Sequence, residues 1–187
     1  MPRAFDILVA AIALAILSPV LLVAAIAIKL SSRGPVIYRQ RRVGLGGREF
    51  EMWKLRTMVA GSDPVGVGKV VYRDDPRVTG PGRLLRRTSL DEIPNFVNVL
   101  RGEMAIVGPR PTIKAQVDDY TPRQKRRHEV LPGITGWAKV QGRAGIPWEE
   151  RIELDVWYVD HRSLALDLRI LARTLVLLVS GQGLAPD

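Results

Sequence analysis

The hydropathy pattern begins with an apolar run from Ile7 to Ile28, in which Ser18 is the only polar side chain. As a straight helix, a run of this length would reach ~33 Å, enough to cross a bilayer core of ~30 Å. The run is too long for a signal peptide, and no small-residue cleavage site precedes the charges that follow it. The pattern therefore predicts a helix that enters a membrane.

The apolar run has a break near its centre, where Ser18 precedes Pro19. Proline has no N–H and clashes with the carbonyl four residues earlier, whereas the serine hydroxyl can hydrogen-bond to a freed carbonyl. Two topologies fit this pair. The residues alone favour a kinked transmembrane helix, and the alternative is a re-entrant hairpin of two short legs that enters and leaves by the same face.

The charges on either side of the run predict the location of the remainder of the chain. Arg3 is the only cation before it, and five follow it closely. The positive-inside rule places everything after residue 30 in the cytoplasm under either topology. The five following cations are Lys29, Arg33, Arg39, Arg41 and Arg42.

Alternation with a period of two predicts a β-hairpin over residues 36–58, with its turn at residues 44–47. On the second strand this alternation places Lys54 and Arg56 on the same face. Without further evidence, two such cations indicate a solvated strand edge more often than an anion-binding pair.

Local signals divide the following part of the chain into short elements. Residues 59–82, rich in Gly, Pro and Asp, predict a long loop, and residues 91–100 predict a helix. Residues 104–111 predict a short strand that runs into a rigid turn. Thr121 begins a helix signal, with Pro at the next position and Gln three residues after the threonine.

The last part of the chain combines turns with two amphipathic helices. Residues 131–148 are rich in turn formers. Spacings of three and four then mark two helix faces, the second of which fits either a protein core or a membrane interface. The first face is Trp148, Ile152, Val156 and Val159, and the second is Leu164, Leu168, Leu171, Leu175 and Leu178. Together these elements predict an α+β fold.

Composition narrows the chemistry that this fold can support. The 187 residues contain no cysteine, which excludes a disulfide framework and a thiolate metal site, and their two histidines nearly exclude a multi-histidine metal site. The net charge is +9, and 22 of the 28 cations are arginine, whose planar fork matches phosphate and carboxylate oxygens. Residues 1–62 bear nine cations and three anions, so much of the excess charge surrounds the apolar run, where it would face anionic lipid.

The densest cationic run, with Arg83, Arg86 and Arg87, leads into the adjacent carboxylates Asp91 and Glu92. The simpler interpretation is that the two acids cap a helix. Either Ser89 is the N-cap and Glu92 completes a capping box, or the helix starts at Asp91 with Pro94 in its first turn. The functional interpretation is phosphoryl chemistry, in which a carboxylate nucleophile needs arginine or Mg²⁺ to neutralise phosphate oxygens. The residues alone favour capping.

Five stretches in this order resemble the bacterial sugar transferases, specifically the small monotopic phosphoglycosyl transferases. They are RAFDILVAAIALAILSPVLLVAAIAIKL, GPVIYRQRRVGLGGREFEMWKLRTM, RRTSLDEIPNFVNVLRGEMAIVGPRP, HEVLPGITGWAKVQGR and LDVWYVDH. The resemblance covers nearly the full length. It implies an α+β fold with a re-entrant membrane helix over residues 1–32, broken at Ser18-Pro19. It implies a cytoplasmic, membrane-associated catalytic domain over residues 33–187, in which a β-hairpin packs with several short and amphipathic helices.

The resemblance also implies a reaction and its site. Such enzymes transfer a sugar-1-phosphate from a UDP-sugar to polyprenol (undecaprenyl) phosphate, releasing UMP, with Mg²⁺ as cofactor. Asp91 would be the nucleophile that forms a covalent phosphosugar intermediate, and Glu92 would assist the metal or a proton transfer. Both carboxylates would hold the metal. Four cations would bind phosphate groups: Lys54, Arg56, Arg86 and Arg110.

The implied location is the bacterial inner membrane, with the catalytic domain on the cytoplasmic face. The implied partners are the UDP-sugar, polyprenol phosphate and membrane lipids, and nucleic acid is not among them. The resemblance does not decide whether the chain forms a homodimer. Lys139 and Gln141 depart from the GWAQVNGR pattern frequent in the family. Two rival hypotheses are a basic membrane-anchored module that binds without chemistry and a degenerate homologue that serves as a scaffold. Neither explains the carboxylate pair among the arginines.

Overall fold

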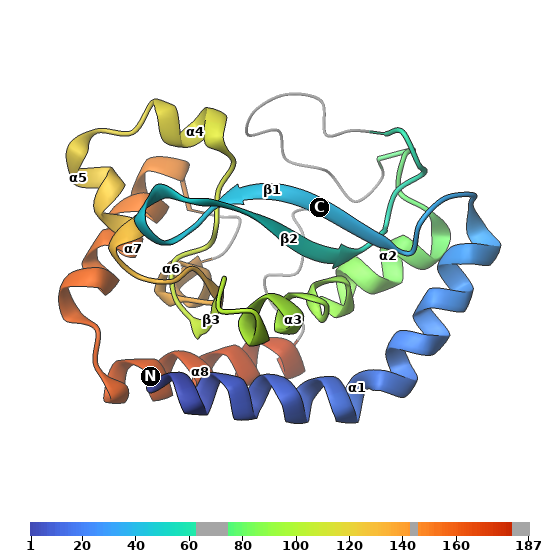
Figure 1. Cartoon of the computed structure of the whole chain (residues 1–187), viewed down its shortest axis with the longest axis horizontal. Coiled ribbons are helices and arrows are strands. Elements are labelled where there is room, and N and C mark those ends of the chain that lie inside the picture. Colours follow the sequence, from blue (N-terminus) through green and yellow to red (C-terminus); the bar gives the residue numbers. More distant parts are fainter. Residues whose placement is uncertain (63–74, 143–145, 181–187) are drawn as a thin grey trace.

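The structure, a computed structural model, describes residues 1–62, 75–142 and 146–180 and has the predicted α+β composition. A two-stranded hairpin crosses the middle of the molecule, and short helices surround it (Figure 1). Two longer helices, α1 (Arg3–Ser31) and α8 (Leu164–Ser180), run along the lower edge in this view.

The predicted hairpin is confirmed as β1 (Ile37–Val43) and β2 (Glu49–Leu55), which pair antiparallel. The short helix η1 (Leu45–Gly47) forms the turn between them. The register runs from the Ile37–Leu55 pair to the Val43–Glu49 pair. Strand β2 ends at Leu55, so the alternation that was predicted to continue to Arg56 stops one residue earlier.

A second, parallel sheet joins β3 (Ala105–Val107) to β4 (Gly133–Thr135). Strand β3 was predicted, whereas β4 lies in the segment for which only turns were predicted. The two backbones approach so closely that a Cβ added at Gly133 would lie 2.1 Å from the backbone nitrogen of Gly108. A glycine is required there, and the same glycine made the segment look like a turn in the sequence.

The next elements are α2 (Gly80–Arg87), η2 (Leu90–Glu92) and α3 (Asn95–Leu100). The loop predicted to reach residue 82 therefore ends earlier, because the Thr79 hydroxyl accepts a hydrogen bond from the Gly82 nitrogen (3.1 Å) and caps α2. Residues 63–74 of that loop lie outside the described residues. The single helix predicted for residues 91–100 is divided into η2 and α3.

Two of the later helix signals are confirmed. Thr121 and Gln124 form the predicted capping box at the start of α5. In α7 (Trp148–His161), Ile152 and Val156 of the predicted face are buried. The remaining short helices are α4 (Lys114–Asp118), α5 (Pro122–Lys125), η3 (Arg126–Glu129) and α6 (Trp137–Gly142).

The leucine stripe of α8, predicted as either core or membrane interface, is mostly exposed, and only Leu171 of its five residues packs against the core. Leu168 and Leu175 are 51% and 64% exposed, and Leu164 and Leu178 are also exposed. The buried side of α8 is instead formed by Leu166 and Ile170, which join a core cluster with Ala10 of α1, Val99 and Met104.

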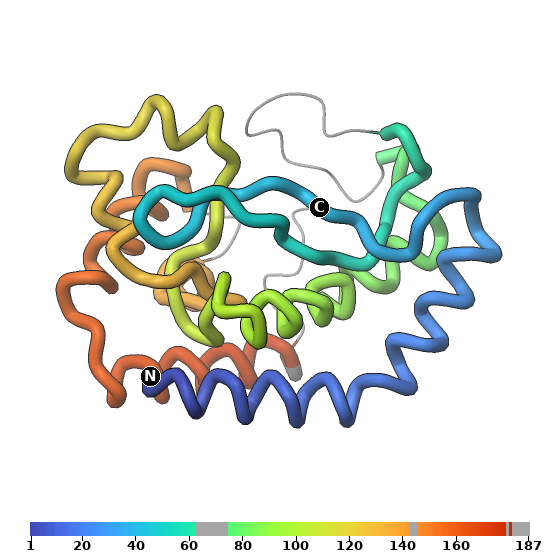
Figure 2. The backbone as a smooth tube through the Cα atoms, in the orientation of Figure 1, coloured from blue at the N-terminus to red at the C-terminus, as the bar shows by residue number. Residues whose placement is uncertain are grey.

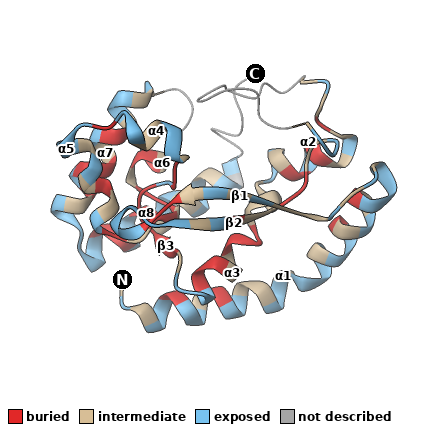
Figure 3. Cartoon of the chain, turned by 45° about the horizontal axis from the view of Figure 1, so that its top comes forward, coloured by how far each residue is buried: buried red, intermediate tan, exposed pale blue. Residues whose placement is uncertain are grey.

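Helix α1 is continuous through Pro19 but bends, and its second half rises away from the first (Figure 2). The Ser18 hydroxyl donates to the carbonyl of Ala15 (2.8 Å), the carbonyl that Pro19 leaves without its helical partner, as predicted. Most of the helix surface is exposed (Figure 3). Among the described helices, α1 alone is long and apolar enough to cross a membrane. The bend fits both predicted topologies.

Candidate active site

Asp91 and Glu92 lie in the η2 turn between α2 and α3. The residue before the turn, Ser89, has a left-handed backbone conformation (φ 57°), and its side chain caps no helix. The predicted Ser89–Glu92 capping box is therefore wrong. Freed from a capping role, the Glu92 side chain makes contacts with distant parts of the chain.

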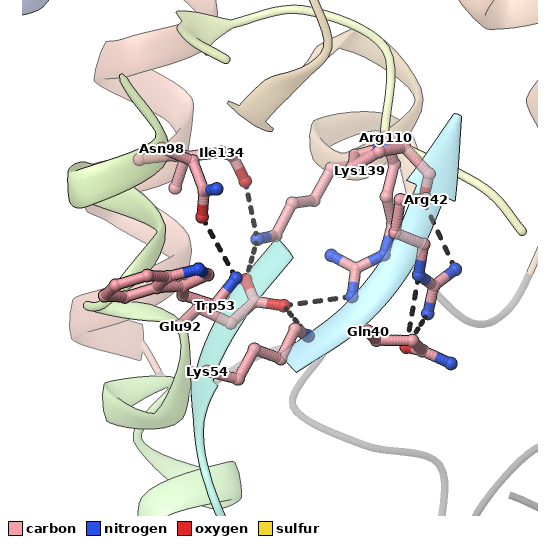
Figure 4. A network of polar contacts seen from close by, with 10 residues as sticks. Gln40, Arg42, Trp53, Lys54, Glu92, Asn98, Arg110, Ile134 and Lys139 are labelled. Atoms are coloured by element: carbon pink, nitrogen blue, oxygen red, sulfur yellow. Dashed lines mark hydrogen bonds and ion pairs between the residues drawn. The ribbon is translucent and has the colours of Figure 1, made fainter. Parts of the chain in front are cut away.

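The hairpin is fixed over this turn by Asn98, a fully buried residue of α3. Its amide oxygen accepts a hydrogen bond from the Trp53 nitrogen (3.0 Å), and its amide nitrogen donates to the Glu51 carbonyl (2.6 Å) and to Glu103 (2.7 Å). Because Trp53 immediately precedes Lys54, these bonds place Lys54 beside η2 (Figure 4).

Three cations surround the Glu92 carboxylate (Figure 4). Lys54 of β2 and Arg110 each donate to Oε1 at 2.9 Å. Lys139 of α6 donates to Oε2 at 3.0 Å and to the Ile134 carbonyl at 3.1 Å. Both oxygens of Glu92 are thus engaged, and its side chain is 12% exposed.

The surroundings of Asp91 and Glu92 shift the pKa values of the two carboxylates in opposite directions. Burial alone would raise the pKa of Glu92, but Arg110, Lys139 and Lys54 hold it well below its usual range. Burial raises the pKa of Asp91, and the negative charge of Glu92 raises it further against the opposing effect of Lys54. Glu92 is therefore a fixed anion, whereas Asp91 is the carboxylate whose charge is less favoured.

Asp91 makes no hydrogen bond or ion pair with the residues that the structure describes. It lines a cavity of about 320 Å³ together with Glu92, Lys54, Arg86 and Arg110. Of the three arginines that precede it in α2, Arg86 alone lines this cavity, and Arg83 and Arg87 are exposed. Five of the six residues predicted to act on substrate are thus brought together around one space.

The sixth, Arg56, which was predicted to bind phosphate, is not among the residues that line this cavity. Its guanidinium is buried and donates to the carbonyls of Arg33 (2.7 Å) and Ser32 (2.8 Å) at the end of α1. Gly34 permits this packing, since it has a φ of 121° and an added Cβ would lie 2.1 Å from an Arg56 nitrogen. Arg56 satisfies orphan carbonyls at the helix end and does not line the cavity.

Sequence reasoning missed Lys139 as a partner of Glu92 and missed the buried pair of Arg127 and Asp155. Both members of this pair line the cavity and are 3% exposed. Arg127 belongs to a cationic run that is typical of a solvated face, so the sequence around it did not indicate burial. The sequence around Asp155 did indicate a buried ion pair, because a carboxylate beside the apolar face of α7 needs a buried partner.

The resemblance implies Mg²⁺, and the donor groups allow its fit to be tested. Mg²⁺ is held in proteins by one or two carboxylates together with substrate phosphates and water. Asp91 has unengaged oxygens, whereas Glu92 would have to give up a cationic partner. The described residues contain no group of three or more His, Cys, Asp or Glu side chains arranged to hold a metal. The site therefore fits a metal that Asp91 shares with substrate phosphates.

Comparison with known proteins shows the family of this chain. The family model for bacterial sugar transferases matches residues 1–181. The chain is 43% identical to an uncharacterized sugar transferase of Bacillus subtilis, over 97% of this chain and 89% of that protein. The chain belongs to the bacterial sugar transferase family, and it is a transferase of that class.

Two further relatives have names that state a reaction. One is the UDP-glucose:undecaprenyl-phosphate glucose-1-phosphate transferase of Escherichia coli, 45% identical over 92% of this chain and 39% of the relative. Another is the UDP-N-acetylgalactosamine-undecaprenyl-phosphate N-acetylgalactosaminephosphotransferase of Aeromonas hydrophila, 41% identical over 97% of this chain and 44% of the relative. The chain thus spans less than half the length of these two proteins.

Proposed function

We propose that this chain transfers a sugar-1-phosphate from a UDP-sugar to polyprenol phosphate, giving a polyprenol diphosphosugar and UMP. The Escherichia coli and Aeromonas relatives are named for reactions of this kind, with undecaprenyl phosphate as acceptor. Their names specify different sugars, so the proposal leaves the sugar open. The product would be the first membrane-bound intermediate of glycan assembly.

The observation that supports this proposal best is the contrast between the two carboxylates. Glu92 accepts hydrogen bonds from three cations, while Asp91 beside it is unengaged and faces the cavity. A nucleophile needs free oxygens at the place where the substrate binds. The surrounding cations offset the repulsion between a carboxylate and a phosphate, and this neutralisation is the main demand of phosphoryl transfer.

The proposed chemistry proceeds in two displacements on one phosphorus atom. An oxygen of Asp91 forms a bond to the phosphorus that bears the sugar, as the bond from that phosphorus to the UMP oxygen breaks. UMP leaves, and the phosphosugar stays on Asp91. A phosphate oxygen of the lipid then attacks the same phosphorus, and the Asp91 carboxylate leaves as the lipid diphosphosugar forms.

The other residues of the cavity would position and neutralise charge in this scheme. Arg86 and Arg110 would hold phosphate oxygens, and Glu92 would keep Lys54, Lys139 and Arg110 in place. A Mg²⁺ ion bound by Asp91 and the substrate phosphates would supply additional neutralisation of the diphosphate. This assigns Glu92 an organising role in place of the predicted metal ligation.

The exposed apolar surfaces of α1 and α8 support a membrane location. Both helices expose large aliphatic side chains, including Ile16 of α1 and Leu175 of α8, at 69% and 64%. Such surfaces are stable in contact with lipid. We place residues 33–187 on the cytoplasmic face of the bacterial inner membrane, with α1 re-entrant at Ser18-Pro19, so that the cavity is accessible to both soluble nucleotide and lipid phosphate.

The test is UMP release by purified protein given a panel of UDP-sugars and Mg²⁺, with and without polyprenol phosphate. Wild-type protein should release UMP with one donor, in a lipid-dependent manner, and EDTA should stop the reaction. Asp91→Asn should lower the rate by about 10⁶-fold, the scale for loss of a nucleophile. Asp118→Asn, an exposed residue of α4, is the matched control.

A phosphosugar adduct on Asp91, detected by mass spectrometry in the absence of lipid, would support the covalent step directly. Substantial UMP release by Asp91→Asn would overturn the nucleophile assignment. Lack of release from every donor by folded, membrane-bound wild-type protein, together with no adduct, would favour the binding-module or scaffold hypotheses.

A further inference from the structure

The cavity at the carboxylate pair extends beyond the groups that phosphoryl transfer requires. Asp91, Lys54 and Arg86, which come from η2, β2 and α2, line it. Trp148, Ile152 and Asp155 of α7 line it too, and the part of the cavity at these residues is called here the α7 end. A nucleotide sugar has three parts, so lining residues that are not needed at the reacting phosphates can contact the nucleoside.

A chain of contacts joins these two sets of residues. Arg110 donates to Glu92 through its guanidinium (2.9 Å), and its backbone carbonyl accepts a hydrogen bond from Arg127 (2.8 Å). Arg127 in turn forms a buried ion pair with Asp155. The position of the phosphate-binding arginine is thus tied to the α7 end of the cavity.

Asp155 is held as a hydrogen-bond acceptor in the cavity wall. Arg127 engages only its Oδ2 and also donates to the Tyr120 hydroxyl at 2.8 Å. The Oδ1 atom of Asp155 has no hydrogen-bond partner among the residues that the structure describes. A buried ion pair is weak evidence for a role in stability alone, because desolvation offsets much of its attraction. A fixed carboxylate with one spare oxygen suits a ligand that donates hydrogen bonds.

Trp148 supplies the second kind of contact that a nucleoside needs. It lies seven residues before Asp155, two turns away on the same face of α7, and it also lines the cavity. Aromatic side chains stack on nucleobases, and carboxylates accept hydrogen bonds from ribose hydroxyls. Sugar hydroxyls would also satisfy a carboxylate. The Arg127 guanidinium lies 5.9 Å from the centre of the Trp148 ring, so a nucleobase would stack on the part of the indole that lines the cavity.

We propose that the α7 end of the cavity is the nucleoside subsite of the donor, with Trp148 against the base and Asp155 accepting a hydrogen bond from the ribose. This inference rests on the proposed function and extends it. The sugar-bearing phosphate then lies toward Asp91, with Arg110 between the two parts of the substrate. Selection for the nucleotide and chemistry on the phosphate are thereby assigned to different ends of one cavity.

The test compares the binding of UMP, 2′-deoxy-UMP and inorganic pyrophosphate to full-length protein in detergent. Asp155→Asn should weaken UMP binding by about tenfold, the scale of one hydrogen bond to a charged group, and leave pyrophosphate binding unchanged. Wild-type protein should prefer UMP to 2′-deoxy-UMP, and Asp155→Asn should lose this preference. Glu153→Gln, an exposed carboxylate of α7, is the matched control.

Because Asp155 also holds Arg127, a second variant keeps that ion pair and removes only the aromatic ring that lies 5.9 Å from the Arg127 guanidinium. Trp148→Leu should weaken UMP binding and spare pyrophosphate, whereas Trp157→Leu, a more exposed tryptophan outside the cavity, should change neither. Equal losses for UMP and pyrophosphate, or unchanged UMP binding in folded variants, would overturn the subsite. A change in preference among UDP-sugars without a change in UMP binding would assign the α7 end to the sugar and overturn it too.

These outcomes are distinct from failure of the proposed function. If wild-type protein releases UMP from a UDP-sugar while both α7 variants keep full UMP affinity, the reaction stands and the subsite is wrong. If wild-type protein neither binds UMP nor releases it from any donor, both proposals fail together.

Discussion

Two polar clusters flank the end of β2, and the cations in them have different partners. In the first, Lys54 contacts Glu92 beside the cavity. In the second, only two residues further along the chain, Arg56 contacts the backbone carbonyls that end α1. Lys54 and Arg56 were both predicted to bind phosphate, yet only Lys54 lines the cavity, and Arg56 binds carbonyls at the end of α1.

The two clusters differ in how much positive charge they leave without a neutralising partner. The Arg56 guanidinium is directed at neutral carbonyls and does not line the cavity. At the other cluster, Lys54, Arg110 and Lys139 share a single carboxylate, so positive charge is in excess beside a space large enough for a ligand. A buried cation alone is thus no sign of a binding site, whereas excess charge that faces a cavity is one.

The largest expected effect is on catalysis at the first cluster. Lys54→Met should lower kcat/KM for UMP release by about 10²- to 10³-fold, because it removes a cation that offsets charge in the transition state. Stability should change little, since Arg110 and Lys139 still compensate Glu92.

The control for this prediction is Lys114→Met, an exposed lysine of α4. Activity measurements need a parallel thermal melt in detergent to show that each variant is folded. Near-normal kcat/KM in folded Lys54→Met would show that Lys54, like Arg56, does not act on substrate. Lys54 would then be explained as a solvating cation at a strand edge, as its sequence alone favours.

The second effect is on folding at the other cluster. Arg56→Met should destabilise the protein by about 2–4 kcal/mol, because it leaves the partly buried carbonyls of Ser32 and Arg33, just after α1, without their donor. The kcat/KM of the molecules that stay folded should change by less than about threefold, since a residue outside the cavity contributes little to transition-state binding.

The measurement pairs denaturant unfolding with activity normalised to the folded fraction. Arg33→Met is a suitable control, since it removes a neighbouring guanidinium but keeps the carbonyl that Arg56 binds. Loss of activity in Arg56→Met at unchanged stability would show that Arg56 binds phosphate after all.

The contrast between these clusters also explains which features the sequence could predict. The hairpin, the Thr121 capping box and the buried face of α7 were predicted because their signals span only a few residues. The Ser89 capping box failed although its pattern was equally local. Glu92 found stronger partners in the folded protein, and none of them is near it in the sequence.

Long-range contacts account for the remaining failures. The three cations at Glu92 are 38, 18 and 47 residues away from it, and the carbonyls bound by Arg56 come from the end of α1. Asp91 and Arg110 could be assigned to a site only through the family resemblance. Lys139 stood out in the sequence as a departure from the family pattern, but its contact with Glu92 depends on how α6 packs.

The smallest predicted effect is a shift in pH dependence, and it isolates the influence of Glu92 on Asp91. Burial and the Glu92 charge raise the pKa of Asp91 above 3.8, and the nucleophile must be ionised to react. As the pH falls through this raised pKa, Asp91 takes up a proton and activity is lost, so the acidic limb of kcat/KM lies at higher pH than for an ordinary aspartate.

Glu92→Gln removes the negative neighbour and leaves Lys54 and Arg110 to act on Asp91, so its pKa should fall and the acidic limb should move to lower pH. The maximal rate should also fall, because the three cations lose the anion that positions them. The measurement is kcat/KM for UMP release across the acidic range, with Glu49→Gln on the exposed edge of β2 as control. An acidic limb that stays in place or moves to higher pH would show that Asp91 is not the titrating nucleophile, and the division of roles between the two carboxylates would fail with it.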